Sequence, residues 1–88
     1  PLFYNLNCHV NQIRQTFLNI ENILKKEKLT FENVVKLTIL LVDLDNSGLV
    51  NEVMADLFKK PYPARAAYEV SKLPKSSLVE IETIAVKI

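Results

Sequence analysis

The sequence predicts an α/β fold: a two-layer α+β sandwich in which two helices cover one face of a mixed sheet. Three observations lead to this prediction. The chain has 88 residues, 49% of them apolar and 24% charged, which fits a single domain over residues 1–88. Apolar residues recur at helical spacing near the start of the chain. A strand, a helix and another strand then follow between residues 34 and 70, and such a unit forms a right-handed parallel crossover.

The segment 10–28 is predicted to be an amphipathic helix. Its apolar stripe has the period of 3.6 residues and consists of Ile13, Phe17, Ile20 and Leu24. We expect His9 to be a residue of the helix start rather than a metal ligand, because no second ligand stands at a suitable spacing. After the helix, residues 30–33 are typical of a turn or a single helical turn.

A first strand is predicted over residues 34–43. One face of it is wholly apolar and consists of Val35, Leu37, Ile39 and Leu41. The other face is mixed and consists of Val34, Lys36, Thr38, Leu40 and Val42. This pattern indicates a sheet that is covered fully on one side and partly on the other.

A second helix is predicted over residues 48–60, with Ser47 as its N-cap and Pro61 as its terminator. Its apolar stripe consists of Val50, Val53, Leu57 and Phe58. Two further strands are predicted over 64–71 and 78–88, and the loop between them contains Pro74. The element order is therefore helix, strand, helix, strand, strand.

Composition argues against several classes of partner and structure, namely nucleic acids, membranes and disulfide bonds. Eleven basic and ten acidic side chains give a net charge of +1, and the basic residues are scattered, which argues against nucleic-acid binding. The longest apolar run, Ile39–Val42, is far too short to cross a membrane. Cys8 is the only cysteine, so no internal disulfide forms, consistent with a reducing compartment. We expect a cytoplasmic protein; a mitochondrial or other organellar location stays open.

The segment 43–54 has some features of a calcium-binding loop. Asp43, Asp45 and Ser47 stand at the first three ligand positions and Gly48 at the glycine position. The last position, which must supply a bidentate carboxylate, is Met54. We therefore predict no metal site here and interpret these residues as a turn before the second helix.

Two sets of charged residues on the predicted strands could take part in chemistry. Arg65 stands among small residues, and arginine binds a carboxylate with two parallel hydrogen bonds. An ion pair with a surface acid such as Glu69 explains the same residue. Glu80 and Glu82 lie on one face of the last strand, where burial would make either of them a usable general base. An exposed strand end or an ion pair between subunits is the alternative.

Several motifs together resemble the RidA family, also called YjgF/YER057c/UK114 or L-PSP. The similarity runs from about residue 10 to the C-terminus. It is carried by Val34–Thr38, Val42–Leu44, Val50–Val53, Tyr62–Arg65, Leu73–Lys75 and Val79–Ala85. The spacing of Pro-Ala-Arg and Leu-Pro-Lys before Glu-Ile-Glu is specific to this family.

The resemblance implies a chorismate-mutase-like fold, with the last strand antiparallel beside the first and the Arg65 strand on the far side. It also implies a homotrimer with ligand clefts between subunits. The implied activity is hydrolysis of 2-imino or enamine acids, such as 2-iminobutanoate and 2-iminopropanoate, to 2-keto acids and ammonia. No cofactor or metal is implied.

Family motifs also assign roles to residues of this chain. Arg65 would bind the substrate carboxylate, Asn51 and Ala67 would contribute substrate contacts, the latter through the main chain, and Glu80 would position or activate water. Family members often carry cysteine at the position of Ala67, so a thiol role is absent here.

Two features depart from the family pattern. Relatives usually have further N-terminal strands that line the same cleft, and residues 1–9 do not reproduce their motif, although Leu2, Phe3, Tyr4 and Leu6 could form a short strand. Lys28 stands where the family often ends the first helix with glycine. Besides the deaminase, two alternatives stay open: a non-catalytic binding protein for 2-keto acids, and an L-PSP-type endoribonuclease or translation inhibitor.

Overall fold

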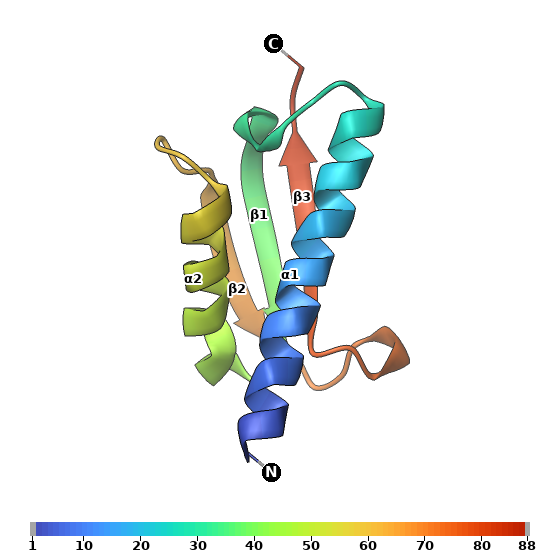
Figure 1. Cartoon of the computed structure of the whole chain (residues 1–88), viewed down its shortest axis with the longest axis vertical. Helices are drawn as coiled ribbons and strands as arrows, with labels where there is room; N and C mark the ends of the chain where they lie inside the picture. Colours follow the sequence, from blue (N-terminus) through green and yellow to red (C-terminus); the bar gives the residue numbers. More distant parts are fainter. Residues whose placement is uncertain (1, 88) are drawn as a thin grey trace.

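The computed structural model describes residues 2–87, with side chains from residue 9 onward. Helices α1 (Leu2–Lys26) and α2 (Ser47–Leu57) lie on one face of a sheet of three strands (Figure 1). The strands are β1 (Val34–Leu41), β2 (Ala64–Glu69) and β3 (Val79–Ala85). Three short 3₁₀ helices are η1 (Phe31–Asn33), η2 (Leu44–Asn46) and η3 (Pro74–Ser76). This arrangement confirms the predicted α+β sandwich.

The sheet has the order β2-β1-β3, so the central strand is β1. β2 is parallel to β1 and reaches it through the α2 crossover, whereas β3 is antiparallel to β1 (Figure 1). Backbone bonds extend both ladders: Val70 N donates to Leu41 O at 2.8 Å, and Val42 N donates to Leu78 O at 3.2 Å. Both predicted neighbours of the first strand are therefore confirmed. β2 and β3 form the two edges of the sheet among the residues described.

The first helix begins earlier than predicted. Leu2, Phe3, Tyr4 and Leu6, which could have formed a strand, belong to α1, and His9 lies inside the helix rather than at its start. No proline or glycine stands between residues 2 and 26, so nothing in this stretch interrupts helical hydrogen bonding. The side chain of Cys8 lies outside the described residues.

α1 ends in a Schellman motif, two residues before the predicted position 28. Leu29 N donates to Leu24 O at 2.8 Å, and Lys28 N donates to Lys25 O at 3.0 Å. Lys28 has φ 60°, the left-handed conformation that this motif needs and that glycine adopts at no steric cost. The family's preference for glycine at this position thus has a physical reason, and Lys28 is strained.

The turn after α1 confirms the prediction for residues 30–33. Thr30 caps η1: its Oγ1 accepts a hydrogen bond from Glu32 N at 3.2 Å, and its backbone N donates to Asn33 Oδ1 at 3.0 Å. Asn33 Nδ2 also donates to Val86 O at 3.0 Å, which ties the turn to the chain beyond β3.

One part of the predicted face pattern of β1 is wrong. Leu37, Ile39 and Leu41 are buried under the helices as expected, but Val35 is 44% exposed and Val34 is buried. The pairing with β3 shifts between Val34 and Lys36, which is a β-bulge. A bulge inserts one residue and reverses the alternation before it, so Val34 takes the core position predicted for Val35.

The second helix differs from prediction only at its ends. It starts one residue early, and its N-cap is Asn46, which makes no side-chain capping bond, rather than Ser47. Phe58, predicted inside the helix, is its C-cap, and its N donates to Met54 O at 2.9 Å. Asp43 instead caps η2 by accepting from Asp45 N at 3.0 Å. β2 and β3 are likewise shorter than the predicted 64–71 and 78–88.

The core lies between the helices and the sheet. The predicted stripes of both helices face it, although Ile20 and Leu57 are only partly buried. The most deeply buried side chains are Ile13, Phe17, Leu37, Ile39, Leu41, Val50 and Val53. The opposite face of the sheet carries no helix in the described chain (Figure 1). We call this opposite surface the bare face.

Candidate functional site

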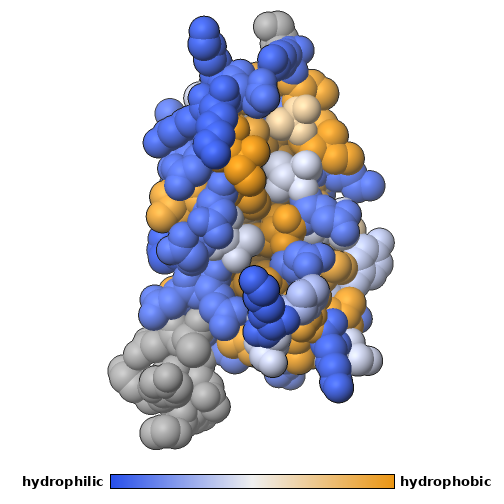
Figure 2. All heavy atoms as spheres, turned by 90° about the vertical axis from the view of Figure 1, so that its right-hand side faces the viewer, coloured by the Kyte–Doolittle hydropathy of each residue, from blue (hydrophilic) through white to orange (hydrophobic). Residues whose placement is uncertain are grey.

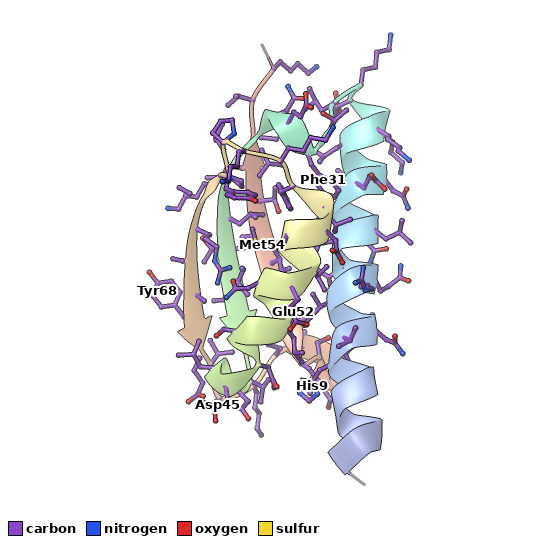
Figure 3. All side chains as sticks on the ribbon, turned by 60° about the vertical axis from the view of Figure 1, so that its left-hand side comes forward. His9, Phe31, Asp45, Glu52, Met54 and Tyr68 are labelled. Carbon is purple, nitrogen blue, oxygen red and sulfur yellow. The ribbon has the colours of Figure 1, made fainter. Side chains whose placement is uncertain are left out.

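Arg65 points toward α2 from the edge strand β2. It pairs with Leu37, whose side chain is fully buried on the helix side of the sheet. Its Nη1 donates a hydrogen bond to Oδ1 of Asn51 and lies 3.7 Å from Sδ of Met54. Met54 lies between α2 and the sheet (Figure 3). The guanidinium is therefore held by one turn of α2 and remains exposed to solvent.

No carboxylate pairs with Arg65 within residues 9–87. The alternative of an ion pair with Glu69 is wrong, because Glu69 Oε1 accepts a hydrogen bond from Leu44 N at 2.9 Å and thereby holds η2. The chain's other arginine, Arg14, does have such a partner: its Nη2 lies 3.0 Å from Asp56 Oδ2. Arg65 is thus a cation held in position and open to a ligand carboxylate.

Ala67 lies two residues beyond Arg65 on the same strand and pairs with Ile39. Its side chain is half-buried on the helix side. Because β2 is an edge strand in the described chain, its outer backbone groups pair with no other strand there. These groups belong to the strand that carries Arg65 and can bind a ligand or another strand.

Glu80 and Glu82 lie on the bare face. Glu80 pairs with Leu40 and Glu82 with Thr38, while the alternate residues Val79 and Ile81 face the helices. Both carboxylates are exposed, and neither forms an ion pair with another residue of the described chain. Of the two sequence-based interpretations, the exposed strand end is the one observed in a single chain.

Arg65 and Glu80 do not meet within one chain. They stand on opposite edge strands and point to opposite faces of the sheet. Two strand spacings separate them by about 10 Å across the sheet, and the offset from Leu37 to Leu40 adds about 10 Å along it. Of the predicted site residues, the fold brings only Arg65, Asn51 and Ala67 together.

The bare face exposes large side chains in addition to Glu80 and Glu82. Tyr68 is 57% exposed and Ile84 56% exposed. Tyr68 points away from the helices (Figure 3). On the side where α1 and β3 face outward, apolar surface lies beside hydrophilic side chains (Figure 2). Residues of the bare face include Lys36, Thr38, Leu40, Ala64, Ala66, Tyr68, Glu80, Glu82 and Ile84.

The described side chains offer no cluster of three His, Cys, Asp or Glu residues that could hold a metal ion. In the segment that resembled a calcium loop, Asp43 caps a turn and Met54 is buried beside Arg65. Nor does any helix in residues 2–87 have the length and apolarity needed to span a bilayer.

Sequence reasoning missed Met54 as a neighbour of Arg65. Asn51 and Met54 are three residues apart, so they share one face of α2. The crossover then brings this face over the start of β2, where Arg65 stands. That spacing was the available signal, but Met54 was considered only as the failed last ligand of a calcium loop.

Comparison with known proteins supplies independent evidence. A sequence model of the family described as Endoribonuclease L-PSP matches residues 6–87. A 2-iminobutanoate/2-iminopropanoate deaminase from Mus musculus is 47% identical over 78 residues, covering 89% of this chain and 58% of the relative. A RutC family protein from Pyrococcus horikoshii is 44% identical over 77 residues. The chain thus spans a little over half the length of these curated relatives.

Solved structures give the same fold. RidA from the Antarctic bacterium Psychrobacter sp. has a TM-score of 0.81 and 41% identity, covering 83% of this chain and 59% of that protein. E. coli TdcF with bound serine has a TM-score of 0.84 and 32% identity, covering 90% of this chain and 65% of that protein.

Proposed function

The chain belongs to the Endoribonuclease L-PSP family, which includes the RidA proteins, and from this we propose that it serves in the hydrolysis of 2-imino acids to 2-keto acids and ammonia. The substrate class is that of small imines such as 2-iminobutanoate and 2-iminopropanoate, which relatives at 45–47% identity have in their names. In this proposal Arg65 binds the substrate carboxylate and Glu80 positions or activates the attacking water.

The observation that carries the proposal is the state of Arg65. A guanidinium that is exposed, oriented by Asn51 and free of any carboxylate in the described chain is suited to grip a ligand carboxylate. Met54, buried beneath the guanidinium, supports it from the core side. The serine bound to TdcF also carries a carboxylate, which agrees with this ligand class.

Hydrolysis of an imine needs no redox step. Water adds to the electrophilic imine carbon, and the Glu80 carboxylate accepts a proton from it while the C=N electron pair moves to nitrogen and nitrogen is protonated. Glu80 supplies this proton to nitrogen and is thereby regenerated. The resulting carbinolamine then transfers its hydroxyl proton through Glu80 to nitrogen, the C–N bond breaks, ammonia leaves and a C=O bond forms. One water is consumed, and one 2-keto acid and one ammonia are released. Positioning and proton transfer are the contributions required of the protein.

We propose further that the site is completed by a second copy of the chain. Arg65 and Glu80 lie on opposite edges and faces of one sheet, so a ligand that touches both must lie between copies. The exposed apolar residues of the bare face would be covered by such an assembly. A closed homotrimer with clefts between subunits satisfies both requirements.

A binding-only protein is a second candidate, and one observation favours it. In the single chain Glu80 is exposed and remote from Arg65, while the carboxylate-binding half of the site is intact. Such a protein would bind 2-keto acids without accelerating imine loss. We do not propose an endoribonuclease, because the near-neutral charge provides no basic surface for RNA.

The proposal is tested by generating 2-iminobutanoate in situ and following its decay with and without protein. We expect Arg65→Ala to lower kcat/KM by about 30- to 1,000-fold, that is about 2–4 kcal/mol, and Arg65→Lys to recover only part of the loss. Glu80→Gln should slow turnover and leave 2-oxobutanoate binding intact. Arg14→Ala is the matched control, since it removes the other, ion-paired arginine.

The outcomes separate the candidates. If Arg65→Ala and Glu80→Gln both match wild type, the deaminase proposal fails. If wild type does not accelerate decay but binds 2-oxobutanoate through Arg65, the protein is a binding-only member of its family.

A further inference from the structure

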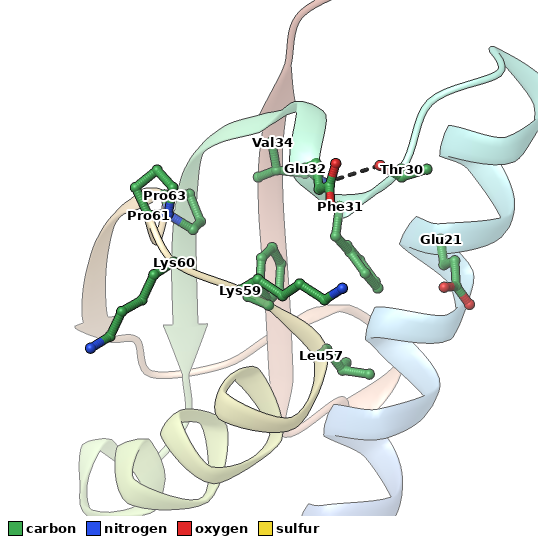
Figure 4. Close-up of a pocket in the computed structure, with 11 residues that line it drawn as sticks. Glu21, Thr30, Phe31, Glu32, Val34, Leu57, Lys59, Lys60, Pro61 and Pro63 are labelled. Atoms are coloured by element: carbon green, nitrogen blue, oxygen red, sulfur yellow. Dashed lines mark hydrogen bonds between the residues drawn. The ribbon is translucent and has the colours of Figure 1, made fainter.

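A pocket lies on the helix side of the molecule, away from Arg65. It opens between α1, η1 and the segment that follows α2, and its volume is about 600 Å³, well within the range of small-molecule sites (Figure 4). We call it the aromatic pocket; its lining includes Glu21, Phe31, Glu32, Phe58, Lys59 and Lys60. Arg65, Asn51 and Met54 do not line it.

Phenylalanine rings form one wall of the aromatic pocket. The rings of Phe31 and Phe58 have centroids 4.7 Å apart at an angle of 42°. Phe17 packs against both edge-on, with centroid distances of 6.4 and 5.9 Å. Phe58 is 5% exposed and Phe31 is half-buried, so the cluster is fixed from behind and open at its rim. A flat ring can pack there in an offset or edge-on arrangement.

The charged residues around this wall are of both signs. Glu21 lies 3.9 Å from Lys25 on α1 and is thereby partnered. Lys59 and Glu32 form no ion pair with any residue in the part of the chain described here. The side chain of Lys59 points across the pocket toward Phe31, whereas Lys60 points away from it (Figure 4). One cation and one anion at the pocket are therefore open to a ligand.

We propose that the aromatic pocket binds an aromatic amino acid. Its ring would pack on Phe31 and Phe58, its carboxylate would meet Lys59, and its ammonium group would meet Glu32. A zwitterion with an apolar ring matches this lining better than a simple anion or cation, because it satisfies both open charges at once. The site is separate from Arg65, so it does not depend on the proposed deaminase function.

Binding is tested with L-phenylalanine by following backbone amide shifts in an NMR titration of the full chain. We expect shifts confined to the segments around Phe31 and Phe58, with a Kd of about 0.1–1 mM, as befits a small ligand in a half-open site. Phenylacetate lacks the ammonium group, phenethylamine lacks the carboxylate and L-alanine lacks the ring, so each should bind at least about fivefold more weakly.

Substitutions distinguish L-phenylalanine binding at the aromatic pocket from binding at other surfaces. Lys59→Met and Glu32→Gln should each weaken L-phenylalanine binding by about fivefold or more. Lys72→Met, which removes a lysine outside the pocket, and Arg65→Ala should leave it unchanged. The proposal is overturned if L-phenylalanine causes no saturable shifts or if Arg65→Ala abolishes them. It is also overturned if phenylacetate binds as tightly as L-phenylalanine and Glu32→Gln leaves L-phenylalanine affinity unchanged.

Discussion

The hydrogen bond from Arg65 to Asn51 gives the sharpest mutational prediction for the candidate site. Asn51→Ala removes the only oxygen of the described chain that accepts a hydrogen bond from this guanidinium. A hydrogen bond to a charged group contributes about 1.5–3 kcal/mol, and solvent exposure of both side chains reduces this to about 1 kcal/mol. Asn51 orients the guanidinium but does not itself contact the ligand in this proposal. We therefore expect Asn51→Ala to bind 2-oxobutanoate about fivefold more weakly than wild type.

Asn51→Asp should have a larger effect, although it is nearly isosteric. A carboxylate at this position would pair with Arg65 and compete with the ligand for the same donors. We expect binding to weaken at least about tenfold, and high salt to restore part of it by screening the new pair. Asn19→Asp is a matched control, because Asn19 also accepts a side-chain hydrogen bond on a helix surface, from Gln15 at 2.8 Å.

Isothermal titration with 2-oxobutanoate measures both effects, and thermal melts verify that the variants remain folded. If Asn51→Asp binds 2-oxobutanoate as tightly as wild type, then Arg65 is not the group that holds the carboxylate, and the reasoning from its free guanidinium is refuted.

Three further predictions concern the fold and its assembly. Lys28→Gly should stabilise the protein by about 1 kcal/mol and raise Tm by about 4–8 °C, because Lys28 has φ 60°; a lower Tm in thermal melts would contradict the assigned helix end. Ile39→Ala should cost about 2–5 kcal/mol in urea unfolding, since Ile39 is fully buried, and a loss below 1 kcal/mol would be inconsistent with the core described. Leu40→Lys should leave the circular dichroism unchanged but shift sedimentation toward the monomer, and an unchanged sedimentation coefficient would exclude the bare face as the interface.

Periodicity was sufficient to predict the core of this fold. The stripes of both helices and the strand pattern of Leu37, Ile39 and Leu41 follow from apolar spacing alone, because burial of these side chains dominates folding. The bulge at Val34 was not predictable, since both adjacent residues are valines and either fits the core. The early start of α1 was predictable from the same signal, because Phe3, Leu6 and Val10 continue the spacing of Ile13 and Phe17 and no helix breaker intervenes; it was missed because residues 2–6 were interpreted as a possible short strand.

The candidate site was only half predictable. Residue type and strand position identified Arg65 and Glu80, and the family motifs identified Asn51 and Ala67. Whether Arg65 pairs with Glu69, however, depends on which partner Glu69 binds. In the structure, the Glu69 carboxylate accepts a hydrogen bond from the backbone N of Leu44. The aromatic pocket was not foreseen, because Phe31 and Lys59 come from segments that only tertiary packing brings together.

Subunit mixing tests most directly whether Arg65 of one copy and Glu80 of another act on one ligand. Arg65→Ala and Glu80→Gln variants would be unfolded together, refolded at equal concentration and assayed for 2-iminobutanoate decay, alongside each variant refolded alone. In a closed ring, random mixing leaves about one site in four with both native residues, so we expect recovery of about a quarter of wild-type activity from two impaired proteins. Mixed assemblies that form, as sedimentation would verify, but show no more activity than either variant alone would contradict it.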